Sequence, residues 1–143
     1  EKQKEDITMA DMSYLKDMPI AILGAGAVGK TMAADCALDG KEVRLWDQPR
    51  FAKINFTNIE KTGITLSGAQ FSYFGYQRKG TVKIAMATDD MAKAVKGAGI
   101  IIVAAVAIAH EDIFRELIPL LKSIFFKNTK KIQCSSGMEK RET

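Results

Sequence analysis

Short apolar runs alternate with longer amphipathic segments along the first half of the chain. Pro19 precedes a four-residue apolar run, 20–23, that ends in glycine, which is typical of a strand buried on both faces. Small and apolar residues at helical spacing follow over 27–38, and Gly40 favours a C-terminal cap just beyond them. The run 43–47 predicts a second strand, and 50–61 predicts a helix with Phe51, Ile54 and Ile59 on one face. Strand, helix, strand and helix in this order indicate an α/β protein with a parallel sheet.

The pattern changes in the second half of the chain. Two β-rich segments, 64–66 and 82–86, flank a stretch that contains Phe71, Tyr73, Phe74 and Tyr76, and they predict a small β-hairpin excursion. Asp89-Asp90 supplies an N-cap for a short helix to Lys96, and 100–103 is the most strand-like run. A last amphipathic helix is predicted over 111–122, with a kink or early end at Pro119. Its inward positions are Ile113, Phe114, Leu117, Ile118 and Leu121. Residues 131–134 could add a weak fifth strand.

Composition and charge limit the number of domains and the kind of partner. The 143 residues, 47% hydrophobic and 27% charged, suit one globular domain. We expect a poorly ordered leader at 1–18, a domain at 19–122, and a basic tail at 123–143 that is a truncated or altered end. The six cations and two anions from Lys122 onward carry the whole net charge of +4, so a solvated end is favoured over nucleic-acid binding.

Membrane, export and metal signals are weak in this sequence. The longest apolar run, 98–109, has about twelve residues, whereas a membrane-spanning helix needs about twenty. The first eighteen residues are polar and of mixed charge, unlike a signal peptide. Cys36 and Cys134 form neither metal spacing nor a disulfide framework. We therefore predict a cytoplasmic protein without a membrane partner or a metal site.

One glycine-rich stretch matches two phosphate-binding motifs. The segment Gly24–Gly29 is a G-x-G-x-x-G dinucleotide fingerprint, and with Lys30-Thr31 it also matches a mononucleotide P-loop. Both motifs place backbone N–H groups and a helix N-terminus against phosphate. The P-loop reading needs a carboxylate at the end of a later core strand to hold magnesium, and the run 100–103 leads instead into alanines and valine.

The residues after the loop favour the dinucleotide motif. Ala33 is small where the helix lies close to the strand, Gly40 ends the helix, and Asp47 lies twenty-three residues after Gly24. That is near the spacing at which an acid reaches the adenosine ribose. We therefore predict a Rossmann-type doubly wound sheet that binds a dinucleotide through Gly24, Gly26, Ala27, Val28, Gly29 and Asp47. Asp47 favours NAD over NADP, although Arg50 nearby could tolerate a 2′-phosphate.

The chain resembles the N-terminal domain of the opine (octopine and nopaline) dehydrogenases from about Pro19 to Lys122. The resemblance lies in 21–26, in Leu45-Trp46-Asp47, in 87–89 and in 101–110. It implies NAD(P)H-dependent reductive joining of a 2-oxo acid to an amino acid. It also implies that the segment after Val103, with Ala105 and Val106, lies beside the nicotinamide. Ketopantoate reductases are similar in outline and are the second choice, and a stand-alone NAD-sensing module is a further alternative.

No catalytic residue is assigned from the sequence. In the opine family the catalytic histidine and aspartate belong to a C-terminal domain that has no counterpart here. His110, the only histidine, has no evident acid–base partner, so a structural or cofactor-contact role is favoured. We therefore expect the chain alone to be inactive as an enzyme, and we expect self-association through the surface that a second domain would cover.

Overall fold

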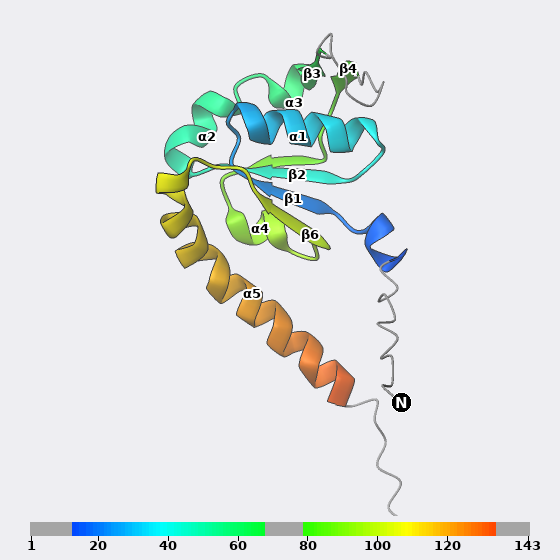
Figure 1. The fold of residues 1–143 in the computed structure, drawn as a ribbon, viewed down its shortest axis with the longest axis vertical. Helices are drawn as coiled ribbons and strands as arrows, with labels where there is room; N and C mark the ends of the chain where they lie inside the picture. Colours follow the sequence, from blue (N-terminus) through cyan, green and yellow to red (C-terminus); the bar gives the residue numbers. More distant parts are fainter. Residues whose placement is uncertain (1–12, 68–78, 134–143) are drawn as a thin grey trace, which may run out of the picture. The chain divides into compact units, whose positions relative to one another are not determined.

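The computed structural model describes residues 13–67 and 79–133 (Figure 1). The chain divides into two compact units, Glu1–Ala104 and Ala105–Thr143. The first contains η1 (Ser13–Asp17), β1 (Ile20–Leu23), α1 (Ala27–Leu38), β2 (Val43–Trp46), α2 (Pro49–Asn55), α3 (Ile59–Thr62), β3 (Ile64–Leu66), β4 (Gly80–Val82), β5 (Met86–Thr88), α4 (Met91–Val95) and β6 (Ile100–Val103). The second contains η2 (Ala107–Ala109) and α5 (His110–Gln133).

The main sheet has four parallel strands in the order β5-β2-β1-β6. Ile22 of β1 is in register with Leu45 of β2 and with Ile102 of β6, so the three strands end at the same edge. The chain passes from β1 outward to β2 and β5 and then returns to β6 on the other side of β1. The fold is therefore the predicted α/β type, with a parallel sheet flanked by helices in a Rossmann-type arrangement.

The core forms where the two central strands are covered on both faces. All four residues of β1 are buried, which explains why this strand is a continuous apolar run and does not alternate. Figure 1 shows α1 on one face of the sheet and α4 on the other. Ala33 and Ala34 of α1 have no exposed surface, and their small size lets the helix lie close to the strands. The largest enclosed side chains include Trp46, Ile22 and Leu23, and burial of each of the two aliphatic ones stabilises the fold by about 1.5–3 kcal/mol.

The predicted hairpin is present but is shorter than expected. β3 pairs with β4 in antiparallel fashion, with Ile64 opposite Val82. The β-rich run 82–86 is not one strand, because the chain leaves β4 at Val82 and joins the main sheet as β5 at Met86. Ala85 N–H donates to the Val43 carbonyl and anchors this transition. The aromatic stretch from Phe71 to Tyr76 lies outside the described residues.

The predicted helix over 50–61 is interrupted. α2 ends at Asn55 and α3 begins at Ile59, with Phe56 as the C-cap of α2. The Thr57 hydroxyl donates to the carbonyls of Lys53 and Ile54, which gives these carbonyls at the end of α2 a side-chain donor in place of the N–H groups of a continuing helix. Only one of the three expected apolar residues is inward: Ile59 is 7% exposed, whereas Phe51 and Ile54 are 46% and 76% exposed.

The second unit contains a helix longer than the sequence predicted. α5 runs from His110 to Gln133 with Pro119 inside it, so the predicted end near 122 was wrong. Residues 131–133 are helical, which also contradicts the predicted strand there. Ile113 and Leu117 are buried as expected, but Phe114 and Ile118 are exposed and Leu121 is half-buried. No helix among the described residues is long and apolar enough to cross a membrane.

Candidate functional site

The glycine loop lies where strand order reverses. It follows β1, whose neighbours β2 and β6 are reached by excursions to opposite sides. The carboxyl ends of parallel strands at such a reversal are the usual place for a ligand in an open α/β sheet. Ala104 N–H donates to the Leu23 carbonyl, which continues the pairing of β1 and β6 up to the loop. The topology thus places the glycine loop at the carboxyl end of β1, beside the reversal of strand order.

Two of the three glycines are needed by the backbone itself. Gly24 has a φ of 115°, which favours glycine, and its N–H donates to the Trp46 carbonyl at 2.8 Å. At Gly29 a Cβ atom would lie 1.7 Å from the Gly24 carbonyl oxygen, so no side chain fits there. These two positions fix the turn and press the start of α1 against it.

Gly26 differs because its backbone makes no such demand. Its φ and ψ are −71° and −171°, and a Cβ atom there would meet nothing within 4 Å. Gly26 is the N-cap of α1, and no side chain caps this helix. The first helical hydrogen bond runs from Lys30 N–H to the Gly26 carbonyl, so the N–H groups of Ala27, Val28 and Gly29 precede the helical ladder. The open space over Gly26 therefore faces a helix N-terminus suited to an anion such as a pyrophosphate.

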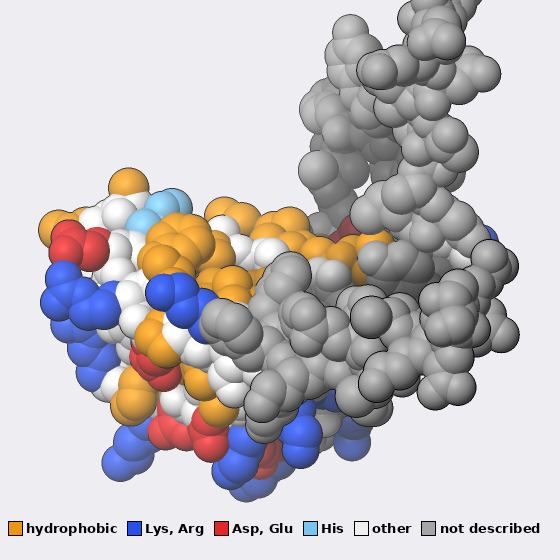
Figure 2. Space-filling model, turned by 90° about the horizontal axis from the view of Figure 1, so that it is seen from below, with side chains coloured by type: hydrophobic (Ala, Val, Ile, Leu, Met, Phe, Trp, Pro, Cys, Tyr) orange, Lys and Arg blue, Asp and Glu red, His pale blue; other side chains and the backbone are white. Residues whose placement is uncertain are grey.

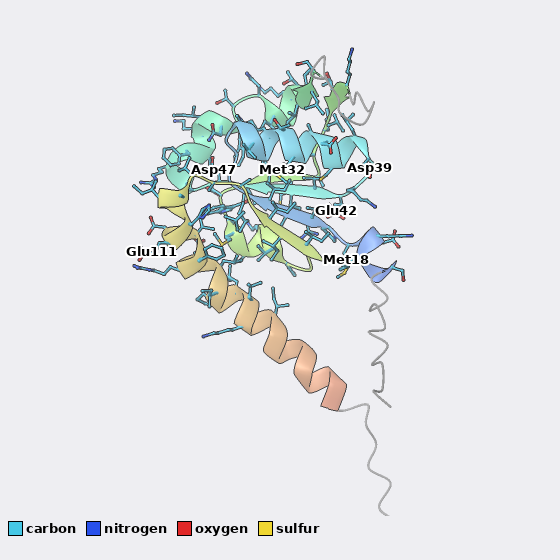
Figure 3. All side chains as sticks on the ribbon, viewed as in Figure 1. Met18, Met32, Asp39, Glu42, Asp47 and Glu111 are labelled. Atoms are coloured by element: carbon cyan, nitrogen blue, oxygen red, sulfur yellow. The ribbon has the colours of Figure 1, made fainter. Side chains whose placement is uncertain are left out.

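Asp47 lies directly beyond β2, at the same edge as the glycine loop. Figure 3 places it near α2, whereas Glu42, before β2, lies at the opposite end of the sheet. Asp47 is 7% exposed, and its Oδ1 accepts from Gln48 N–H at 2.9 Å. Its Oδ2 accepts from Asn55 Nδ2 at 2.5 Å. Gln48 and Asn55 thus each hold one oxygen of the carboxylate, and the carboxylate lies where the dinucleotide motif predicts contact with a ribose.

The other polar groups near Asp47 have partners of their own. The Arg50 side chain donates through Nε to Gln48 Oε1 at 2.8 Å, and its guanidinium carbon lies 4.7 Å from the Phe51 ring centroid. This exposed stacked position is consistent with a surface contact to the adenosine end, which stays a prediction. The Trp46 indole N–H donates to the Asp89 carbonyl at 3.0 Å, which links the end of β2 to the turn before α4.

The predicted nicotinamide contacts begin the second unit. Val106 is 70% exposed, and Ala105 is half-buried. The Ala105 carbonyl lies 2.9 Å from His110 Nε2, and the His110 ring meets Phe114 edge-on with centroids 6.2 Å apart. Figure 2 shows this histidine in pale blue on the surface of the molecule. Both contacts of His110 lie within the second unit, and the role predicted for this residue from the sequence stays a prediction.

Two residues of the site were not foreseen. Asn55 was read only as part of a longer helix, and its bond to Asp47 becomes possible because α2 ends there. The pair Asp89-Asp90 was predicted to supply a helix N-cap, and Asp90 does so through its Oδ1, which accepts from Lys93 N–H. The contact of Asp89 was not predicted: its backbone carbonyl accepts from the Trp46 indole N–H. A lone asparagine eight residues after an acid carries no recognised signal. The Lys30-Thr31 pair, which had suggested a P-loop, includes a Thr31 hydroxyl that donates to the Ala27 carbonyl.

Comparison with known proteins identifies the family. Residues 19–143 match the family described as NAD-dependent glycerol-3-phosphate dehydrogenase N-terminus. A glycerol-3-phosphate dehydrogenase [NAD(P)+] from Chlorobium phaeobacteroides (strain BS1) is 31% identical over 127 residues, which cover 85% of this chain and 32% of that protein. The chain thus spans about a third of the length of the curated relative that it matches.

These matches support the general part of the resemblance noted from the sequence. They show an NAD(P)-binding dehydrogenase domain, and they give no support to the opine specificity. The family match also includes the segment 123–143, beyond the domain boundary expected from the sequence. The chain belongs to the family of NAD-dependent glycerol-3-phosphate dehydrogenase N-terminal domains.

Proposed function

We propose that this chain is the part of a glycerol-3-phosphate dehydrogenase that holds the dinucleotide. The N–H groups of Ala27, Val28 and Gly29 bind the pyrophosphate, Gly26 leaves room for it, and Asp47 accepts hydrogen bonds from the adenosine ribose. Arg50 borders the adenosine end. The observation that carries the proposal is the open space over Gly26 beside an uncapped helix N-terminus, with the buried Asp47 at the end of the adjacent strand.

The segment after β6 is the proposed contact for the nicotinamide ring. Ala105 and Val106 lie along the nicotinamide, and the His110 bond to the Ala105 carbonyl holds this turn in shape. A bound NAD(P) supplies hydride transfer at its nicotinamide ring. The name of the curated relative favours glycerol 3-phosphate as the substrate over a 2-oxo acid paired with an amino acid. The groups that bind and protonate the substrate are expected in the part of the relative that this chain does not span.

A substitution at Gly26 tests the site without disturbing the fold. Because the Gly26 backbone suits any residue and its Cβ position is open, Gly26→Val should fold normally. The added side chain should block approach to the pyrophosphate and abolish the fluorescence enhancement of NADH. Thr31→Val, on the exposed surface of the same helix, is the matched control and should bind as before. NADH binding that is unchanged in Gly26→Val would remove the glycine loop from the site.

A further inference from the structure

Asp47 is a buried carboxylate that depends on hydrogen bonds rather than on a cation. It is 7% exposed, and among the residues that the structure describes no ion pair reaches it. Burial of a charge is costly unless donors replace the lost water. The replacement donors are Gln48 N–H, on Oδ1, and Asn55 Nδ2, on Oδ2.

The two donors differ in what they can control. Gln48 follows Asp47 directly in the chain, so the position of its N–H group is set by the backbone and does not depend on any side chain. Asn55 is the last residue of α2, so its amide reaches back to Asp47 across eight residues of sequence. It is the one side-chain donor to Asp47 in the described part of the chain. The position of the second carboxylate oxygen therefore depends on where α2 ends.

The geometry decides how much of the carboxylate remains for a ligand. A carboxylate has about four lone-pair positions, and two of these are used by Gln48 and Asn55. The remaining two suit the 2′- and 3′-hydroxyls of a ribose, each of which can donate. A 2′-phosphate has no such donor and carries like charge, so an ionised, fixed carboxylate disfavours it.

We propose that Asn55 is a positioning residue that holds the Asp47 carboxylate for the adenosine ribose and thereby sets the preference for NAD over NADP. The inference rests on the function proposed above, because it takes Asp47 to be the ribose acceptor. It adds a residue that acts through Asp47 and does not itself touch the cofactor. Asn58 provides the matched control: it lies three residues later, is exposed, and makes no side-chain cap to α3.

Calorimetric titration with ADP-ribose and its 2′-phosphate isolates the adenosine end of the site. For Asn55→Ala we expect ADP-ribose affinity to fall by roughly five- to tenfold, the scale of one ordinary net hydrogen bond, because Asn55 acts through Asp47 and does not touch the ligand. Affinity for the 2′-phosphate form should change little, so the ratio of the two affinities falls. Asn58→Ala should leave both affinities and their ratio unchanged.

The nearly isosteric Asn55→Asp variant gives a second readout. A carboxyl at this position faces Asp47, and like charge raises the pKa of the introduced group. When protonated, the introduced carboxyl can donate a hydrogen bond to Asp47; when ionised, it repels the Asp47 carboxylate. ADP-ribose affinity of Asn55→Asp should therefore be weak near pH 8 and recover toward about pH 5, a trend absent from the unaltered chain.

Failure of the inference and failure of the proposed function look different. If the unaltered chain binds ADP-ribose but Asn55→Ala keeps the same affinity ratio and Asn55→Asp shows no recovery at low pH, Asn55 has no positioning role. If the unaltered chain does not bind ADP-ribose or NADH, the proposed function falls, and this inference falls with it. If Asn55→Ala loses affinity for ADP-ribose and for its 2′-phosphate by the same factor, and circular dichroism shows a matching loss of folded protein, the selectivity claim is also overturned.

Discussion

The contact between Gly29 and Gly24 leaves no space for a side chain. A Cβ atom at Gly29 would lie 1.7 Å from the Gly24 carbonyl oxygen, which is backbone and cannot turn aside. We expect Gly29→Ala to lower the free energy of unfolding by about 3 kcal/mol or more, because α1 must move away from the turn. Urea unfolding measures this. Gly26→Ala, where Cβ meets nothing within 4 Å, should cost at most about 1 kcal/mol, because alanine is the poorer N-cap residue. Equal stability of the two variants would contradict this account of the loop.

Asp47 should discriminate between the two nicotinamide cofactors. Its carboxylate lies at the carboxyl end of β2 and can accept from ribose hydroxyls. Asp47→Ala should weaken NAD binding by ~1–3 kcal/mol, the range for losing hydrogen bonds to a charged group. NADP should lose less or gain affinity. Glu60→Ala, which removes an exposed carboxylate on α3, is the control. Equal losses for NAD and NADP would assign Asp47 to folding alone.

At the residue scale, the sequence predicted where a residue lies in the sheet more reliably than which side chains form hydrogen bonds with it. The motif placed Gly24, Gly26, Gly29 and Asp47 at one edge of the sheet because each is tied to the end of a buried strand. The Asn55 bond to Asp47 could not be predicted in the same way, because it depends on where α2 stops. That stop is favoured by the Thr57 hydroxyl, which bonds to preceding carbonyls and leaves no trace in the hydrophobic pattern.

Among the helices, α4 depends on its N-cap residue, Asp90. Asp90 Oδ1 accepts from Lys93 N–H at 3.2 Å, and α4 has only the five residues Met91–Val95. Asp90→Ala should lower the free energy of unfolding by about 1 kcal/mol, and Asp90→Ser should restore most of it. The melting temperature of the purified chain reports the change. Asp89→Ala makes a good comparison, since Asp89 is exposed and its described contact is through its backbone carbonyl. If Asp89→Ala and Asp90→Ala are equally destabilising, the cap is not what stabilises α4.

Elements with two-sided burial were predicted correctly, and those at the periphery were not. β1 is a continuous apolar run because all four of its residues are buried, and β2 is buried except at Arg44, which is half-buried. β6 is also an apolar run, although Ile100 is exposed. The run 82–86 is also rich in β-forming residues, but Val82 belongs to the small sheet and Met86 to the main sheet. Its composition does not reveal where the chain passes from one sheet to the other. Pro119 suggested an end to α5, yet the helix continues through it, since a proline removes one hydrogen bond and does not by itself end a helix.

On the scale of the whole molecule, we expect the chain to bind NADH without catalysing its oxidation. We predict that the purified 143-residue chain binds NADH but does not oxidise it with any pair of 2-oxo acid and amino acid. Reduction of an imine requires a proton donor and a pocket that aligns the substrate. The only histidine is bonded to the Ala105 carbonyl, and the chain spans about a third of its curated relative. Absorbance assays of NADH, with binding verified in the same sample by fluorescence, test this. Oxidation that depends on the 2-oxo acid would contradict it, and His110→Ala would then be the first variant to examine.

The exposed apolar side chains bear on association. In the second unit Val106 and Ile108 are 70% and 90% exposed, and Phe114 and Ile118 remain partly open. The self-association expected from the sequence stays a prediction.

Trp46 has an optical consequence. It is the single tryptophan of the chain, is 1% exposed, and precedes Asp47. Its indole is shielded from water and fixed by the Asp89 carbonyl, so its emission should lie toward the blue and reflect one environment only. Tryptophan emission overlaps the absorption of reduced nicotinamide. The chain therefore carries its own energy-transfer donor next to Asp47, the proposed ribose acceptor, and we expect NADH binding to quench the Trp46 emission without any added label.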